Sequence, residues 1–130
     1  MNPPGVIIRE SPYSAKETID RLQEFLQEHG ATIYARIDQQ AEIQKAVQDI
    51  APLEFILFGN PKAGAPLMKT NPLVALDLPL KVIAWEDEQG KVWLAYNEAS
   101  YIEGRFGLSP IENSPLNLDP VISKILNRGL

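Results

Sequence analysis

The residues with the most scope for chemistry lie in a glycine- and proline-rich stretch, residues 58–68 (FGNPKAGAPLM). It combines the amide of Asn60 and the ammonium of Lys62 with glycines, such as Gly64, that let a ligand approach the backbone closely. If the stretch leads into a helix, successive backbone N–H groups would form an anion-binding concavity, to which Lys62 adds positive charge. We therefore expect a small anion or carboxylate to bind near Asn60, Lys62 and Gly64, with Lys81 as a further candidate. The alternative is a rigid crossover in which glycine and proline only shape the backbone.

Catalytic side chains are sparse elsewhere. The chain has no cysteine and one histidine, His29, so we expect no metal and no cofactor. No serine stands in a nucleophile elbow, and no glycine pattern matches a P-loop or a dinucleotide fingerprint. We therefore expect a non-catalytic protein. The enzymatic alternative uses Lys62 with Asp77 or Lys81 for proton transfer or oxyanion stabilisation, and requires a lysine whose pKa is lowered by burial.

Length and charge exclude several classes of function. A chain of 130 residues with 45% apolar and 22% charged residues fits one globular domain, residues 1–130. The net charge of −5 and the absence of a Lys/Arg cluster argue against nucleic-acid binding. The chain shows neither a signal peptide nor an apolar run long enough to span a membrane. We expect a cytoplasmic protein that binds neither nucleic acid nor a membrane.

Hydrophobic periodicity predicts an alternation of strands and helices. The best-defined helix follows the N-cap candidate Ser14, carries apolar residues at Ala15, Ile19, Leu22 and Leu26, and ends at Gly30. We predict the other elements from similar signals: strands over residues 6–10, 32–38, 55–58, 80–86 and 91–96, and helices over residues 41–50, 63–76, 98–107 and from Asp119 onward.

This order of elements predicts an α+β fold with two layers, in which a curved, mainly antiparallel sheet packs against helices. The adjacent hairpin of residues 80–96 and the lack of regular strand–helix–strand alternation argue against a doubly wound parallel sheet. Because residues 55–58 are apolar on both faces, that strand should lie inside the sheet rather than at its edge.

The hairpin of residues 80–96 also predicts an unusual sheet face. A turn with Gly90 in the left-handed conformation puts Trp85 opposite Trp93, on the same side as Ile83 and Ala95. A solvated face is normally polar, so this apolar face predicts an interface, and we expect a homodimer joined through Ile83, Trp85 and Trp93. The alternative is a monomer in which later helices cover this face and leave a pocket lined by the tryptophans.

Several segments together resemble the bacterial family called domain of unknown function 302 (DUF302). The resemblance runs from the first strand nearly to the end of the chain. It is carried by residues 58–68, 71–72, 77–82, 85–87, 90–93 and 105–108. It implies a fold similar to the TATA-box-binding-protein-like class, with a β-α-β(4)-α core, and it implies no activity.

This chain departs from the family pattern at two positions. In the family a histidine often follows the aspartate matched by Asp38, and another often stands at the position of Phe106. This chain has Gln39 and Phe106 there. A metal or acid–base role for those histidines therefore does not carry over.

Overall fold

The structure is a computed structural model that describes residues 2–46 and 49–127. Its centre is a five-stranded sheet in the order β1-β5-β4-β3-β2, and every neighbouring pair is antiparallel. The strands are β1 (Val6–Ser11), β2 (Thr32–Asp38), β3 (Leu53–Gly59), β4 (Leu80–Glu86) and β5 (Val92–Asn97). The predicted α+β class is confirmed, and β3 lies inside the sheet as expected.

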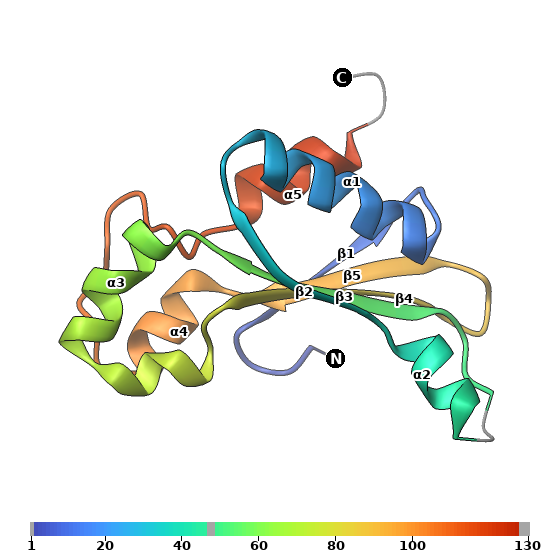
Figure 1. Cartoon of the computed structure of the whole chain (residues 1–130), viewed down its shortest axis with the longest axis horizontal. Helices are drawn as coiled ribbons and strands as arrows, with labels where there is room; N and C mark the ends of the chain where they lie inside the picture. Colours follow the sequence, from blue (N-terminus) through green and yellow to red (C-terminus); the bar gives the residue numbers. More distant parts are fainter. Residues whose placement is uncertain (1, 47–48, 128–130) are drawn as a thin grey trace.

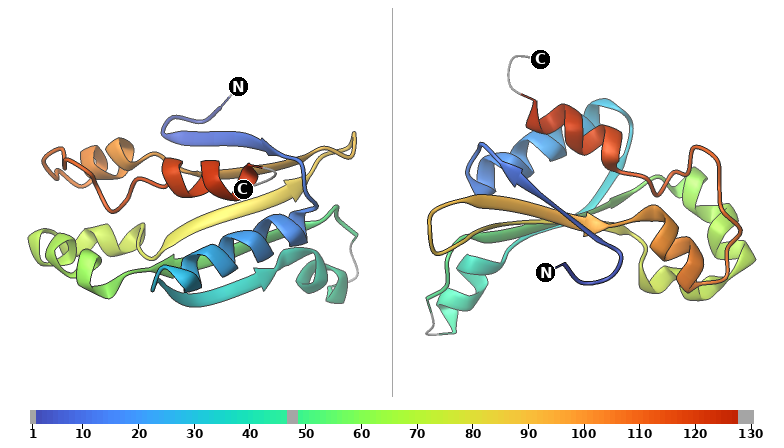
Figure 2. Two further views of the ribbon diagram at one scale, coloured as in Figure 1. Left: turned by 90° about the horizontal axis from the view of Figure 1, so that it is seen from above. Right: turned by 180° about the vertical axis from the view of Figure 1, so that it is seen from behind.

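Two helices form the second layer. Helices α1 (Ala15–Glu28) and α5 (Asp119–Leu126) lie side by side on one face of the sheet (Figures 1 and 2). The shorter elements extend from the ends of the sheet, with α2 (Gln39–Lys45) at one end and α3 (Pro61–Thr70), η1 (Pro72–Leu76) and α4 (Ala99–Arg105) at the other. The core is thus β-α-β(4)-α, with four short helical insertions.

Helix α1 forms as its sequence predicts. The Ser14 Oγ accepts a hydrogen bond from the Glu17 N–H at 3.0 Å, which satisfies one of the free amides at the helix start. The apolar stripe that ends with Leu26 is buried, and Gly30 follows the helix with φ of +79°. The core beneath α1 and α5 is completed by fully buried side chains of the three inner strands, Ile56, Val82 and Leu94.

Three helix boundaries differ from the prediction. The helix expected over residues 63–76 is two elements, because Asn71 precedes Pro72, adopts an extended conformation and ends α3 there. The helix expected over residues 41–50 starts at Gln39, since the Asp38 carboxylate caps it, and it ends at Lys45. The predicted helix also includes Val47, an apolar position that lies outside the described residues.

The third difference concerns α5. Asp119 was expected to cap this helix, but Leu118 is the N-cap residue and Asp119 is the first helical residue. Its carboxylate turns toward the sheet instead, where Oδ1 accepts a hydrogen bond from the Tyr96 hydroxyl at 2.5 Å. Two further bonds tie α5 down, from Arg9 to Ser123 Oγ and from Arg21 to the Ile125 carbonyl.

The hydrogen bond between Tyr96 and Asp119 makes the free energy of unfolding depend on pH in the alkaline range. Burial and the hydrogen bond to Asp119 raise the pKa of Tyr96 from 10.0 to about 12. The folded state therefore holds the Tyr96 proton more tightly than the unfolded chain does, and this contribution is complete below pH 10 and lost as pH rises toward 12. We expect urea unfolding to show about 2 kcal/mol less stability from this group at pH 12 than at pH 9. Tyr96→Phe should reduce the decline by that amount, and an unchanged decline in Tyr96→Phe would contradict the assignment.

The alternation predicted for β2 is broken by a bulge. Apolar residues at every second position predict one shared face for Ile33, Ala35 and Ile37, but the register shifts between Ile33 and Ala35. Ile33 consequently pairs with Phe58 and packs against the core, whereas Ala35 and Ile37 face the other side of the sheet. The bulge residue Tyr34 is left 51% exposed.

Candidate functional site

The predicted anion-binding loop is the start of α3, and its amides are already used. The Asn60 Oδ1 accepts from the Lys62 N–H at 3.0 Å, and the Asn60 carbonyl accepts from the N–H groups of Ala63 and Gly64 at 3.0 and 2.9 Å. Pro61 has no N–H to offer. The geometry therefore leaves the first turn of α3 without the free amides on which the predicted anion concavity depends.

A cavity of about 300 Å³ lies against the inner side of α3. It is enclosed by α3, the ends of β2 and β3, residues 78–80 and residues 115–116. Asn60 and Gly64 line it, whereas Lys62 is exposed and does not. Among the described residues that line this cavity, none is charged. Of the four predicted ligand-binding residues, Asn60 and Gly64 therefore line this cavity, whereas Lys62 and Lys81 do not.

The residues of the enzymatic alternative have separate partners. Both carboxylate oxygens of Asp77 accept from Arg105 at 3.0 Å, and the Lys81 ammonium lies 4.6 Å from the centre of the Phe55 ring. Within residues 2–46 and 49–127, no hydrogen bond or ion pair joins Lys62 to Asp77 or to Lys81. Lys62 and Lys81 are both exposed, so neither has the burial that a lysine base requires.

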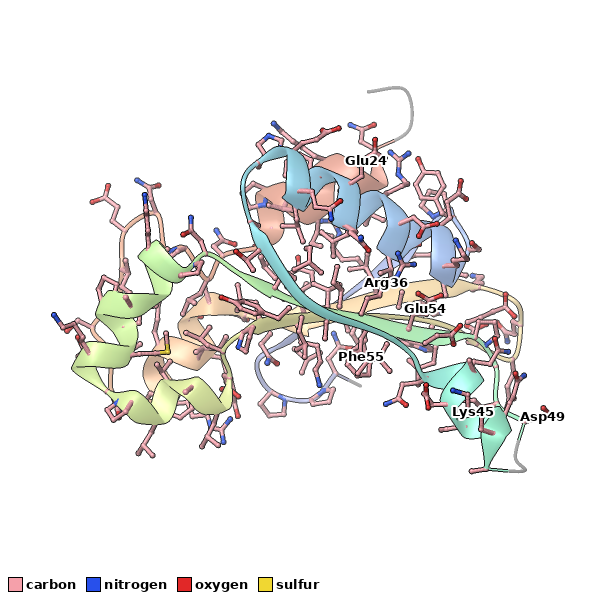
Figure 3. The ribbon with its side chains drawn as sticks, viewed as in Figure 1. Glu24, Arg36, Lys45, Asp49, Glu54 and Phe55 are labelled. Atoms are coloured by element: carbon pink, nitrogen blue, oxygen red, sulfur yellow. The ribbon has the colours of Figure 1, made fainter. Side chains whose placement is uncertain are left out.

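A second candidate surface is the sheet face opposite α1 and α5, which we call the outer face. Figure 3 shows Phe55 on this side and Arg36 and Glu54 on the helix side. The strand register arranges the outer face in three rows. The central row is Ile8, Ala95, Ile83, Phe55 and Ile37; the tryptophan row is Glu10, Trp93, Trp85 and Leu53; the lysine row is Val6, Asn97, Lys81, Leu57 and Ala35.

The outer face is apolar, as the hairpin predicted. Trp85 stands opposite Trp93, and both are partly exposed together with Ile83. The Trp93 Nε1–H donates to Asp87 Oδ2 at 2.8 Å, which fixes the indole, and this bond lowers the pKa of Asp87. Helix α5 does not cover this face, because it lies beside α1 on the other side of the sheet (Figure 1).

Two further findings bear on function. Within the described residues there is no group of three or more His, Cys, Asp or Glu side chains that could hold a metal ion. None of the helices in the described parts of the chain is long and apolar enough to cross a membrane.

Comparison with known proteins identifies the family. The model of "Domain of unknown function DUF302" matches residues 7–127. The chain belongs to the DUF302 family. Phe106, one of the two positions at which we expected the chain to depart from the family pattern, is buried at the end of α4, and its carbonyl accepts a hydrogen bond from Asn71.

A solved structure agrees with this assignment. The crystal structure of an uncharacterized conserved DUF302 protein from Bacillus stearothermophilus superposes with a TM-score of 0.77 over 95% of this chain and 97% of that one, at 18% identity. That likeness supports the α+β fold with its five-stranded antiparallel sheet.

The chain also matches proteins from Brucella named "Fluoride-specific ion channel FluC 1". The match to the Brucella suis protein is 38% identical over 104 residues, which is 80% of this chain and 41% of that protein. The Brucella abortus protein matches equally well over 38% of its length. The DUF302 chain therefore spans about two fifths of the length of these curated relatives.

Proposed function

We propose that this DUF302 chain is a non-catalytic assembly domain that forms a homodimer through the outer face. The observation that carries the proposal is the central row of apolar residues, which crosses all five strands from Ile8 to Ile37 without a polar side chain. The face of a sheet that contacts water normally carries polar residues, so an extended apolar face indicates an interface.

The surface area of the chain supports the same proposal. A compact monomer of 14.5 kDa exposes about 6,900 Å². This chain exposes 8006 Å², an excess of roughly 1,100 Å² over that relation. A stable interface of standard size removes about 800 Å² from each partner. One dimer contact of ordinary size would thus bring the exposed area back toward that of a compact protein.

The three rows are also suited to a second copy of the same face. A twofold axis running along the central row would lay the tryptophan row of one copy over the lysine row of the other. The ammonium of the partner's Lys81 would then face the indole of Trp85, an attractive cation–π pairing. A different partner protein would need its own cation at the position that faces Trp85 to make the same pairing.

The Brucella relatives suggest where such a domain operates. The region similar to this chain is about two fifths of each of those proteins. We propose that a DUF302 dimer there would hold two copies of the longer chain together. The channel activity in the names of those proteins is not part of this proposal for the present chain.

Light scattering coupled to size-exclusion chromatography tests the dimer. At about 50 µM we expect twice the mass of one chain, and Trp85→Arg should give a folded monomer, because a charge would be buried without a partner. Leu73→Arg is the matched control, since Leu73 is an exposed apolar residue (61%) of η1 that lies off the outer face, and it should remain dimeric. A monomeric wild type, or a dimer that survives Trp85→Arg, would rule out this interface.

A further inference from the structure

The cavity beside α3 has the dimensions and rigidity of a small-molecule site. Its volume of about 300 Å³ is at the lower end of the range for ligand pockets, about 300–1,000 Å³. Three of its walls contain proline, at Pro61, Pro79 and Pro115. Because proline has a fixed φ, these walls lose little conformational entropy when a ligand binds.

The rim of the cavity exposes apolar groups that a ligand would cover. Tyr34 is 51% exposed and Met68 is 38% exposed, and both line the cavity. The β2 bulge places Tyr34 there, and its ring lies beside Gly59, where a Cβ would be in ordinary van der Waals contact with Tyr34 Cε2 at 3.6 Å. Bulges recur where a strand must redirect a side chain beside a functional site. Met68 adds an unbranched side chain that adapts to different ligand shapes.

The chemistry of the walls selects an uncharged ligand. No charged side chain lines the cavity, and the amides of Lys62, Ala63 and Gly64 are bonded within α3. An ionised group inside would therefore be desolvated without a partner. The Asn60 Oδ1 is occupied by the N-cap bond, so the part of this amide left for a ligand is its NH₂ group, which donates.

We infer that this cavity binds a small, uncharged and mainly apolar molecule that carries one hydrogen-bond acceptor directed at Asn60. Tyr34 and Met68 cover the ligand at the rim, and Gly64 provides the space that it occupies. The site is formed within one copy of the chain, so the inference stands independently of the proposed dimer.

Chemical-shift mapping on the ¹⁵N-labelled chain tests the site with defined probes. The probes are p-cresol, which has a ring and one hydroxyl, toluene, which has the ring alone, and sodium phosphate and acetate as anions. We expect p-cresol and toluene to shift the amide resonances of Gly59 and Gly64 in a saturable way. The two anions should leave both resonances in place.

Three variants test which residues contribute to binding of the ring probes. Gly64→Leu fills the cavity and should weaken p-cresol binding at least tenfold, and Tyr34→Ser, at a half-exposed position that folding tolerates, should weaken it several-fold. Asn60→Asp keeps an N-cap acceptor but removes the NH₂ donors, so it should weaken p-cresol several-fold and leave toluene within twofold. Lys62→Ala is the control and should leave both ring probes within twofold.

Three results would overturn the inference. One is the absence of shifts up to the solubility limit of the ring probes. Another is unchanged p-cresol affinity in both Gly64→Leu and Tyr34→Ser. The last is a saturable response of Gly59 and Gly64 to phosphate or acetate that Lys62→Ala abolishes, which would establish the anion site expected from the sequence instead.

Discussion

Replacing Arg36 by alanine should lower the free energy of unfolding by about 3 kcal/mol, because it leaves a buried carboxylate without its counter-ion. Arg36 projects from β2 toward α1 and donates from Nε and a terminal nitrogen to Glu54 Oε2 at 3.0 and 2.9 Å. The Glu54 side chain is only 10% exposed. The other terminal nitrogen of Arg36 reaches Asp20 Oδ1 at 2.7 Å and Gln23 Oε1 at 3.0 Å on α1. Arg36 thus joins two strands and a helix.

The large loss of stability arises because Glu54 is left as an unpaired buried charge, rather than from the loss of the ion pair itself. Replacing both partners, as in Arg36→Met with Glu54→Leu, should therefore cost less than Arg36→Ala alone, although it removes the same bonds. Urea unfolding of the wild type and both variants at pH 7 measures this. A double variant as unstable as Arg36→Ala would refute it.

Gly5→Ala should lower the free energy of unfolding by about 2–4 kcal/mol, a loss comparable to that expected for Arg36→Ala. Gly5 has φ of +76°, where a residue with a Cβ is strained, and that Cβ would lie 2.1 Å from Tyr101 Cγ. The backbone at Gly5 cannot easily shift away from Tyr101, because the Gly5 carbonyl accepts a hydrogen bond from the Glu98 N–H at 2.7 Å. The N-terminal segment, β5 and α4 therefore meet at a point with no space for a methyl group.

A double-mutant cycle separates the two causes. Tyr101 is 43% exposed, so Tyr101→Ala alone should cost little. In Gly5→Ala with Tyr101→Ala the overlap is gone and only the backbone strain, about 1 kcal/mol, should remain. Denaturant unfolding of the four proteins gives the coupling. Additive effects would mean that Tyr101 is not what excludes a side chain at Gly5.

The features that the sequence determined by itself are those encoded within a few residues. Helix α1 starts and ends as predicted because its capping serine, apolar stripe and terminal glycine all act over one or two turns. The hairpin was predictable for the same reason. Gly90, with φ of +80°, sets the turn, and the turn sets the register that pairs Trp85 with Trp93 and places both tryptophans on one sheet face.

Tertiary structure decided the features that depend on distant segments. Asp119 looked like a local helix cap, but the Tyr96 hydroxyl, 23 residues away, offered its carboxylate a hydrogen bond within the protein. The shift in β2 that exposes Tyr34 depends on how β2 pairs with β3, and no residue signal in β2 alone marks it. The cavity draws its walls from four separate stretches of chain, so its lack of charge could not be deduced from the loop that holds Asn60, Lys62 and Gly64. Local backbone preferences fix where elements begin and end, whereas the partners of a polar side chain are chosen only when folding removes water from around it.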